Sequence, residues 1–356
     1  MWRLRVANRQ TSRPTTSHFR VRRQYSTFLN TRSRTSIRPL AVGTVLSFGA
    51  LASYYFFFPD ASRGAPTSKH EKLSPSHFTP CTITSSEPCG PNTRLLTLKI
   101  PTKFLPASDE KRFSSIWSVF VKDDDIQVER PYTPLEGVDA EGRMRFWIKK
   151  YPHGEVSRWL HSKEVGDEIE IRGPLQTWLW KDDDVWDEVV MISGGTGIAP
   201  FYQLFHNIIS QGVSPRTKFT LLHSSRSPSE LPPSAILLPL SSFASENPKR
   251  FQFRVFVDTL DPTDEIDRLK VKVGRINRAT LVSSIKEQSS PSKWWMWPFK
   301  KSAELDIDVR KTLFLVCGPE PMITALSGPY GRNFSQGPVG GVLEELSATS
   351  SQVYKF

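Results

Sequence analysis

The chain has 356 residues, enough for one large domain or two ordinary domains that each bury a core. Its net charge of +11 would suggest nucleic acid or an anionic membrane as a partner if the charge were spread evenly. Residues 1–59, however, contain ten arginines and no Lys, Asp or Glu, which leaves 37 basic and 36 acidic residues in the rest of the chain. The nearly neutral remainder argues against a nucleic-acid partner.

Residues 1–38 have the composition of a mitochondrial transit segment, because they are rich in Arg, Ser and Thr and lack acidic residues. The stretch Arg23-Gln24-Tyr25-Ser26 resembles a matrix-protease cleavage site that cuts before Ser26. A disordered basic tail is the alternative interpretation.

Residues 39–59 are predicted to form a single transmembrane anchor. They include "LAVGTVLSFGALASYYFFF", nineteen uncharged residues whose helix would rise about 28 Å, enough to cross a hydrocarbon core. A secretory signal is the competing interpretation, but the Arg-rich lead is too long for one. Arginines tend to stay on the matrix side, so we expect the folded part to face the intermembrane space, with an outer-membrane location as the alternative.

The remaining sequence divides into a linker and two domains. Residues 60–77 are polar and rich in Pro and Ser, which is typical of a linker. Residues 78–181 contain short alternating runs separated by turn residues, which predict an antiparallel β-barrel. Residues 182–356 alternate apolar strands with helix-length segments, which predicts a mostly parallel α/β domain. The overall prediction is an α+β protein of two domains, preceded by the transit segment and the anchor.

The stretch "RPYTPL", residues 130–135, places Arg130, Tyr132 and Thr133 beside two prolines. The simplest interpretation is the end of a strand followed by a turn, because proline fixes its own φ and favours extended conformations in the residue before it. A guanidinium, a phenol and a hydroxyl within four residues also permit a binding role.

Three further segments are suited to phosphate or ligand binding. In "ISGGTGIAP", residues 192–200, glycines lie where an apolar strand gives way to a helix, so a phosphate can approach bare backbone N–H groups. In "HGEVSRWL", residues 153–160, N–H groups and a serine stand at a helix start. "CGPEPMI", residues 317–323, follows an apolar strand at the edge where open α/β sheets bind ligands. A turn without a ligand and a cysteine that is only a small apolar residue are the alternatives.

Taken together and in this order, the four motifs resemble those of the ferredoxin reductase superfamily and, within it, the cytochrome b5 reductase-like flavoenzymes. The resemblance covers roughly residues 76–356 and implies FAD as cofactor and NADH or NADPH as electron donor. It implies that Arg130 pairs with the FAD pyrophosphate, that Tyr132 packs on the flavin ring and that Thr133 hydrogen-bonds near the reactive flavin nitrogen.

The same resemblance assigns the remaining site residues. It implies a second pyrophosphate contact and two segments that hold the nicotinamide coenzyme, with Thr133 and Cys317 nearest to the chemistry and no metal. The residues concerned are Gly154, Val156 and Ser157 for the pyrophosphate, Gly195, Thr196 and Gly197 for the coenzyme turn, and Cys317, Gly318 and Pro319 beside the nicotinamide. Ser225 and Arg226 resemble the pair with which NADPH-using relatives hold the 2′-phosphate, and a solvated turn is the alternative.

The electron acceptor is less closely defined by the sequence. Residues 327–341, "SGPYGRNFSQGPVGG", are an insertion where cytochrome b5 reductases continue directly into a helix. With the transit segment and the anchor, this insertion makes the chain most similar to fungal inner-membrane flavoproteins that assist haem attachment to cytochrome c. A haem protein is therefore the expected partner: cytochrome c with its haem-attachment machinery, or cytochrome b5. A flavin-bearing assembly subunit without turnover is a third possibility.

Three other features have weaker interpretations. Cys81 and Cys89 are expected to be two buried thiols rather than a disulfide. His70 and His77 are candidate haem contacts, although linker histidines seldom have that role. Residues 291–301, "PSKWWMWPFKK", are either a docking or membrane-surface loop or a surface insertion without function.

Overall fold

The computed structural model describes residues 65–105, 115–124, 127–181, 186–260, 271–288 and 311–356. The predicted transit segment, anchor and tryptophan-rich segment 291–301 lie outside these residues. None of the helices in the described ranges is long and apolar enough to cross a membrane.

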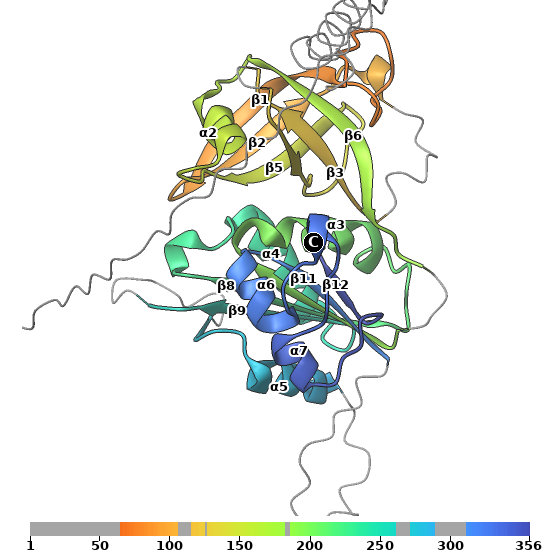
Figure 1. Ribbon diagram of the computed structural model, residues 1–356, viewed down its shortest axis with the longest axis vertical. Coiled ribbons are helices and arrows are strands. Elements are labelled where there is room, and N and C mark those ends of the chain that lie inside the picture. The colour runs from red at the N-terminus through yellow and green to blue at the C-terminus, as the bar shows by residue number, and fades with distance from the viewer. Residues whose placement is uncertain (1–64, 106–114, 125–126, 182–185, 261–270, 289–310) are drawn as a thin grey trace, which may run out of the picture. The chain divides into compact units, whose positions relative to one another are not determined.

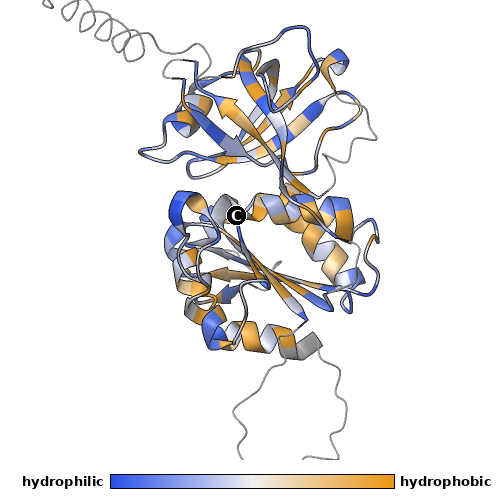
Figure 2. Cartoon of the chain, turned by 45° about the vertical axis from the view of Figure 1, so that its right-hand side comes forward, coloured by the Kyte–Doolittle hydropathy of each residue, from blue (hydrophilic) through white to orange (hydrophobic). Residues whose placement is uncertain are grey.

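The first half of the described chain forms a six-stranded antiparallel sheet with the strand order β4-β3-β6-β1-β2-β5 (Figure 1). A short helix, α2 (Glu155–Ser162), follows β5. The strands are β1 (Thr79–Gly90), β2 (Thr93–Lys99), β3 (Ile116–Lys122), β4 (Glu129–Tyr132), β5 (Arg143–Lys149) and β6 (Glu168–Trp178). Buried and more exposed residues alternate in the first part of β1 and of β6, as the period of two in β-structure requires. Hydrophobic and hydrophilic residues are interspersed over this sheet in Figure 2.

This sheet curls around one core. Leu98 of β2, Phe146 of β5 and Val119 of β3 are all buried in the same apolar cluster, although β3 and β5 are far apart in the strand order. No ladder joins the edge strands β4 and β5 within the described ranges, so the predicted barrel is a curled sheet with an opening between these two strands.

The second half forms a six-stranded sheet of parallel strands in the order β10-β9-β8-β7-β11-β12. The strands are β7 (Glu188–Gly194), β8 (Lys218–Ser225), β9 (Phe251–Val257), β10 (Lys272–Val273), β11 (Thr312–Cys317) and β12 (Val353–Lys355). The helices are α3 (Ala199–Leu204), α4 (Ser234–Glu246), α5 (Arg278–Gln288), α6 (Glu320–Ser327) and α7 (Gly341–Glu345).

Helices cover both faces of this sheet (Figure 1). Apolar side chains of α3 and α4 pack with alternate residues of β7 and β8, including Val189 and Leu221. Those of α5, α6 and α7 pack with the intervening residues, including Val190 and Leu222. Central strands that are buried on both faces read as continuous apolar runs, which explains why the sequence pattern changes after about residue 185.

Hydrogen bonds join the two sheets. The side chain of Gln203, from α3, is fully buried. It accepts the backbone N–H of Trp117 at 2.8 Å and donates to the carbonyl of Pro134 at 2.9 Å. The hydroxyl of Tyr354 donates to the carbonyl of Thr177 at 2.8 Å. The "RPYTPL" segment is thus tied to the first helix of the parallel sheet.

Candidate functional site

Strand β4 presents Arg130 and Tyr132 on one face, because residues two apart in a strand point the same way. They lie opposite Val121 and Val119 of β3. Tyr132 packs against the core of the antiparallel sheet, and burial raises the pKa of its phenol, which keeps the hydroxyl protonated. The simple strand-end interpretation is therefore correct for the backbone, and the side chains remain available for a site.

The second element of the site is the N-terminus of α2. Gly154 is the N-cap, and the helix begins at Glu155. The hydroxyl of Ser157 accepts the backbone N–H of Tyr151 at 3.2 Å and donates to the carbonyl of Gly154 at 3.1 Å. A methyl group on Gly154 would lie 2.6 Å from this hydroxyl, so the turn needs glycine. Free N–H groups at a helix start attract anions.

The glycine-rich turn follows β7, and the "CGP" turn follows its neighbour β11. Ser193 and Cys317 are register partners, so both turns leave the same carboxyl edge. After β7 the chain builds β8, β9 and β10 outward on one side and then returns to place β11 on the other. This reversal is the topological switch point at which open α/β sheets bind ligands.

The two turns are in direct contact. A methyl group on Gly197 would lie 2.5 Å from the carbonyl oxygen of Cys317, and one on Gly318 would lie 3.0 Å from the backbone nitrogen of Gly194. Gly195 is different, because it has a φ of +53° and no atom near its absent side chain. Gly195 is therefore required for its backbone conformation, and Gly197 and Gly318 are required for the close packing of the two turns.

These elements surround one cavity of about 450 Å³, within the size range of small-molecule sites. Most of the predicted site residues line it: Arg130, Tyr132, Thr133, Gly154, Val156, Ser157, Thr196, Gly197, Cys317, Gly318 and Pro319. Gly195, Ser225 and Arg226 do not. The cavity is also lined by residues of β5, the other edge strand, so the opening of the antiparallel sheet between β4 and β5 is part of the site.

Several lining residues have no counterpart in the predicted set. Lys149 and Tyr151 are two of them, and the others are Pro131, Phe146, Trp147, Ile148, Glu155, Gly194, Ala199 and Pro200. Lys149 and Tyr151 come just before the predicted phosphate contact at Gly154. Continuing the two-residue alternation of β5 to the end of the strand would have identified Lys149 as a candidate.

Charged groups around the cavity are paired within the protein. A guanidinium nitrogen of Arg130 lies 3.4 Å from a carboxylate oxygen of Glu155, and both side chains are about half exposed. The ammonium of Lys149 lies 2.5 Å from the carboxylate of Glu230, which follows β8. The Arg130 pair is exposed enough that solvent screening leaves it little net stability, so an anionic ligand can compete for the guanidinium.

Cys317 is a neutral thiol in this environment. Burial raises the pKa of its side chain to about 12, so the thiolate is not populated near neutral pH. The residue is thus suited to contact with a ligand rather than to nucleophilic chemistry.

Ser225 is engaged inside the protein. Its hydroxyl accepts a hydrogen bond from Nε2 of His223 at 3.1 Å and donates to the carbonyl of Glu230 at 3.2 Å. Nδ1 of His223 lies 2.8 Å from the hydroxyl of Ser193, and burial lowers the pKa of this imidazole to about 3. A neutral histidine therefore links the strand before the glycine-rich turn to the loop after β8, while Arg226 is exposed.

The other candidates lie away from this cavity. Cys81 is buried, Cys89 is half-buried and both are free thiols, as expected. His77 is buried with its Nδ1 3.2 Å from Glu71, and His70 is exposed. The described ranges contain no group of three or more His, Cys, Asp or Glu residues arranged to hold a metal ion.

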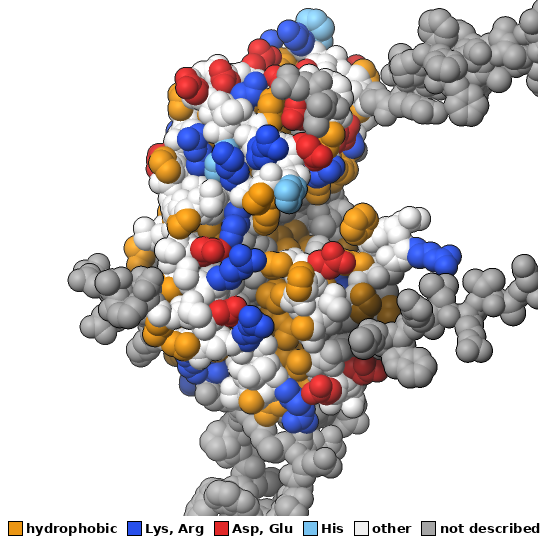
Figure 3. Space-filling model, turned by 60° about the vertical axis from the view of Figure 1, so that its left-hand side comes forward, with side chains coloured by type: hydrophobic (Ala, Val, Ile, Leu, Met, Phe, Trp, Pro, Cys, Tyr) orange, Lys and Arg blue, Asp and Glu red, His pale blue; other side chains and the backbone are white. Residues whose placement is uncertain are grey.

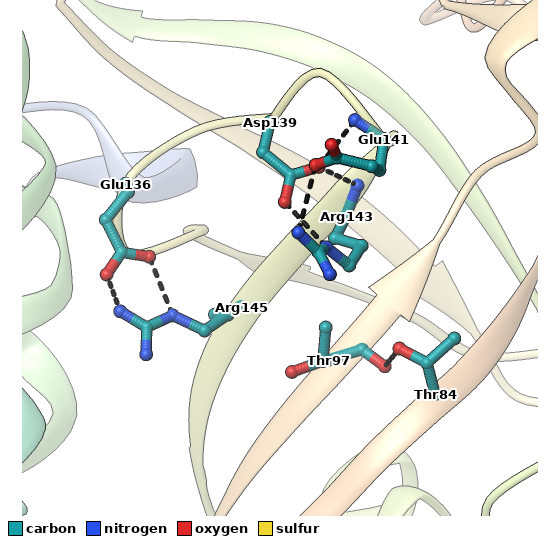
Figure 4. Close-up of polar contacts among 7 residues, drawn as sticks. All are labelled: Thr84, Thr97, Glu136, Asp139, Glu141, Arg143 and Arg145. Atoms are coloured by element: carbon teal, nitrogen blue, oxygen red, sulfur yellow. Dashed lines mark hydrogen bonds and ion pairs between the residues drawn. The ribbon is translucent and has the colours of Figure 1, made fainter.

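A second cavity, of about 740 Å³, lies against β1, β2 and β5. Two of its arginines are held by carboxylates of one turn: Arg145 pairs with Glu136, and Arg143 pairs with Asp139 at 2.7 Å and with Glu141 at 2.9 Å (Figure 4). These pairs brace the turn before β5. Positive and negative side chains are also interspersed over the face in Figure 3.

Glu188 is a buried carboxyl at the start of β7, at the opposite end of this strand from the glycine-rich turn. It lies opposite Lys218 in the ladder, and its Oε1 has no hydrogen-bond partner among the described atoms. Burial raises the pKa of this carboxyl to about 7, while Lys218 and a hydrogen bond from Thr220 oppose the shift.

The main cavity fits FAD together with a nicotinamide coenzyme. A guanidinium, an ammonium, a serine hydroxyl and a helix N-terminus supply donors for a diphosphate, and Tyr132 supplies an aromatic ring. On the other side of the cavity, Gly194, Gly197 and Gly318 let the two coenzyme turns pack closely together. Burial raises the pKa of both Tyr132 and Cys317, so neither side chain is an acid or base near neutral pH, which suits chemistry carried by bound cofactors.

Known proteins share this architecture. Residues 80–180 match the model of the oxidoreductase FAD-binding domain, and residues 191–328 match that of the oxidoreductase NAD-binding domain. NADH-cytochrome b5 reductase 2-A of Vanderwaltozyma polyspora is 28% identical over 328 residues, 91% of this chain and 98% of the relative. NADH-cytochrome b5 reductase 2 of Meyerozyma guilliermondii is 31% identical over 243 residues, 68% of this chain and 72% of the relative.

A solved structure agrees in fold. The cytochrome b5 reductase domain of Ulva prolifera nitrate reductase superposes with a TM-score of 0.56 at 19% identity, covering 80% of this chain and 99% of that one. At this level of identity the likeness concerns the fold alone.

Proposed function

The chain belongs to the NADH-cytochrome b5 reductase family of FAD- and NAD-binding oxidoreductases, and on this premise we propose that it passes electrons from NAD(P)H through FAD to a haem protein. The observation that carries the proposal is the single cavity at the switch point, which joins "RPYTPL", the α2 N-terminus and both coenzyme turns. When bound, the cofactors supply hydride transfer from nicotinamide to flavin.

The protein's part in this reaction is to hold and orient. Arg130 and the N–H groups at the start of α2 bind the FAD diphosphate, with Glu155 giving up its contact to Arg130. Tyr132 and Thr133 border the flavin. The contact between the glycine-rich and "CGP" turns fixes where the nicotinamide lies, because neither turn can move without displacing the other.

Cytochrome b5 is the first candidate for the acceptor, since the relatives are named NADH-cytochrome b5 reductases. The second candidate is a haem or partner protein in mitochondrial cytochrome c maturation. The insertion 327–341 favours it, together with the Arg-rich segment 1–38 and the apolar segment 39–59. A flavin-bearing assembly subunit without turnover is the remaining alternative.

For location we propose the mitochondrial inner membrane, with the reductase domains in the intermembrane space. The support is the order of an acid-free, Arg-rich segment and a nineteen-residue apolar run, with the arginines left on the matrix side. In isolated mitochondria, protease should reach the reductase domains only after the outer membrane is ruptured. Digestion in intact mitochondria would indicate the outer membrane instead.

The proposed activity is tested with the purified, FAD-loaded protein. Anaerobic NADH should bleach the flavin, and the reduced protein should then be mixed with cytochrome b5 or cytochrome c to identify the acceptor. A flavin that stays oxidised with excess NADH and NADPH would leave only the assembly role. Bleaching followed by rapid reduction of cytochrome c alone would select the maturation function.

A further inference from the structure

The insertion between α6 and α7 is a folded loop, defined here as residues 328–340. The buried ammonium of Lys355, in β12, donates to the carbonyls of Pro329 at 2.7 Å and Pro338 at 3.0 Å. The side chain of Gln336 pairs with the backbone of Lys355, accepting its N–H at 2.7 Å and donating to its carbonyl at 2.9 Å. Both ends of the loop are thus fastened to the last strand of the parallel sheet.

The loop displays Phe334. This side chain is 87% exposed, the largest fraction for any large hydrophobic residue in the described ranges. Its φ is +56°, and that of Asn333 before it is +53°. A bulky residue in the left-handed region is an outlier, and such strain is kept where it serves a site. Asn adopts this region readily, so the conformational cost falls mainly on Phe334, whose ring is held largely in water.

The base of the loop lies beside the main cavity. The ring of Tyr330 is 6.1 Å from that of Phe334. The hydroxyl of Tyr330 donates to the carbonyl of Phe356, whose ring packs at 5.6 Å against Phe201 of α3. The backbone N–H of Phe356 donates to the carbonyl of Val316 at 2.9 Å, so the base of the loop is connected to the residue before Cys317, which lines the cavity.

The loop is basic on its outer side. Arg332 is its only charged residue, is exposed, and makes no ion pair among the described residues. An unpaired guanidinium beside an exposed aromatic ring is a composition typical of interaction hot spots. The complementary surface is an apolar patch bordered by carboxylates.

We propose that the 328–340 loop is the docking element for the haem protein that accepts electrons, with Phe334 entering an apolar patch on that protein and Arg332 pairing with a carboxylate at its edge. This proposal rests on the proposed function, because it places the acceptor beside the cavity in which the flavin is reduced. A preformed loop binds without the entropic cost of ordering, which accounts for its double attachment to β12.

The test compares four variants of the FAD-loaded protein: Phe334→Ala, Phe334→Gly, Arg332→Gln and Leu238→Ala. Leu238 lies on α4 and is 56% exposed, so it is a matched control for loss of an exposed apolar side chain. Steady-state reduction of cytochrome b5, cytochrome c and ferricyanide by NADH is measured for each. Ferricyanide is a small acceptor that does not need a protein docking surface.

Both Phe334 variants should raise KM for the haem protein about ten-fold, equivalent to about 1.4 kcal/mol, with ferricyanide reduction unchanged. Leu238→Ala should change neither KM for the haem protein nor the rate of ferricyanide reduction. Phe334→Gly alone should also raise Tm, by roughly 2 °C, because glycine accepts the left-handed conformation. Arg332→Gln should raise KM at low salt and lose its effect at high salt.

Unchanged haem-protein kinetics in both Phe334 variants would overturn the docking proposal. The docking proposal would also be overturned if the wild-type protein reduced ferricyanide but neither cytochrome, although this result would still show that the protein is a reductase. A wild-type protein that fails to reduce ferricyanide with either coenzyme would instead refute the proposed function itself.

Discussion

The contact between the two coenzyme turns makes a specific prediction about neighbouring glycines. In Gly197→Ala the added methyl carbon would lie 2.5 Å from the carbonyl oxygen of Cys317 and 2.9 Å from the backbone nitrogen of Gly318. Backbone atoms cannot rotate away as a side chain can, so the turns must separate by about 1 Å to reach ordinary contact. Overpacking of this kind costs about 1–3 kcal/mol of stability.

Gly195→Ala is the matched control. No atom lies within 4 Å of its added carbon, and its φ of +53° costs an alanine about 1 kcal/mol. The two variants should therefore lose comparable stability, but only Gly197→Ala should move the nicotinamide relative to the flavin. A displacement of this size costs about 100-fold in rate.

The measurement is the rate at which NADH bleaches the flavin in anaerobic stopped flow, with Tm recorded for both variants. FAD content should be normal in each, since the diphosphate contacts lie on the other sheet. Equal rates for the two variants at equal Tm would refute the idea that contact between the turns positions the coenzyme.

Four further predictions concern single side chains. Arg130→Ala should weaken FAD binding by about 2 kcal/mol, roughly 30-fold, measured as flavin retained after dialysis; full retention would contradict the assignment. Cys317→Ala should slow flavin reduction by NADH without loss of FAD, and equal loss of both would show that the residue is misplaced. Arg226→Ala should raise KM for NADPH by about five- to thirty-fold and leave KM for NADH unchanged. Ser225→Ala should lower Tm without changing the preference between the two coenzymes, because its hydroxyl is bonded inside the protein. If Ser225→Ala changed the preference and Arg226→Ala did not, the exposed arginine would be excluded as a contact of the 2′-phosphate. The folded-state pKa of Glu188, about 7, lies above the unfolded value, so the native state binds more protons between pH 4.5 and 7 and its stability falls as pH rises through that window. Glu188→Gln should remove up to about 3 kcal/mol of this loss, measured by urea titration at several pH values. An unchanged dependence of stability on pH would contradict this prediction.

Local sequence signals were sufficient to predict the two sheets and most of the cavity. The strands have a clear period of two in one half and continuous apolar runs in the other. The residue types of "RPYTPL" and of the glycine-rich turn were enough to predict that both segments border the cavity. Because motif residues lie at strand ends, the topology brings Thr133, Gly154 and Cys317 to one cavity although they are far apart in the chain.

Pairings made by the tertiary structure could not be predicted in this way. The hydroxyl of Ser225 is occupied by His223 and by a carbonyl in the following loop, and nothing in "LLHSSRSPSE" signals that burial. The Lys149–Glu230 ion pair joins residues 81 apart in the sequence. In the sequence, Lys355 has no feature that distinguishes it from an ordinary strand residue, yet its ammonium fastens the 328–340 loop.

The protonation states of the side chains that line the cavity also bear on which part of the protein selects the electron acceptor. Tyr132 and Cys317 both stay protonated near neutral pH, because burial raises the pKa of each. They shape the site without donating charge, so the cavity selects cofactors by contact and by its diphosphate donors. A haem protein is far too large to enter a cavity of about 450 Å³, so it must be recognised on the outer surface. In the described ranges, Phe334 with Arg332 beside it is the outward feature that combines strain, exposure and an unpaired charge near that cavity. The docking proposal therefore places acceptor choice in a loop none of whose residues lines the cavity.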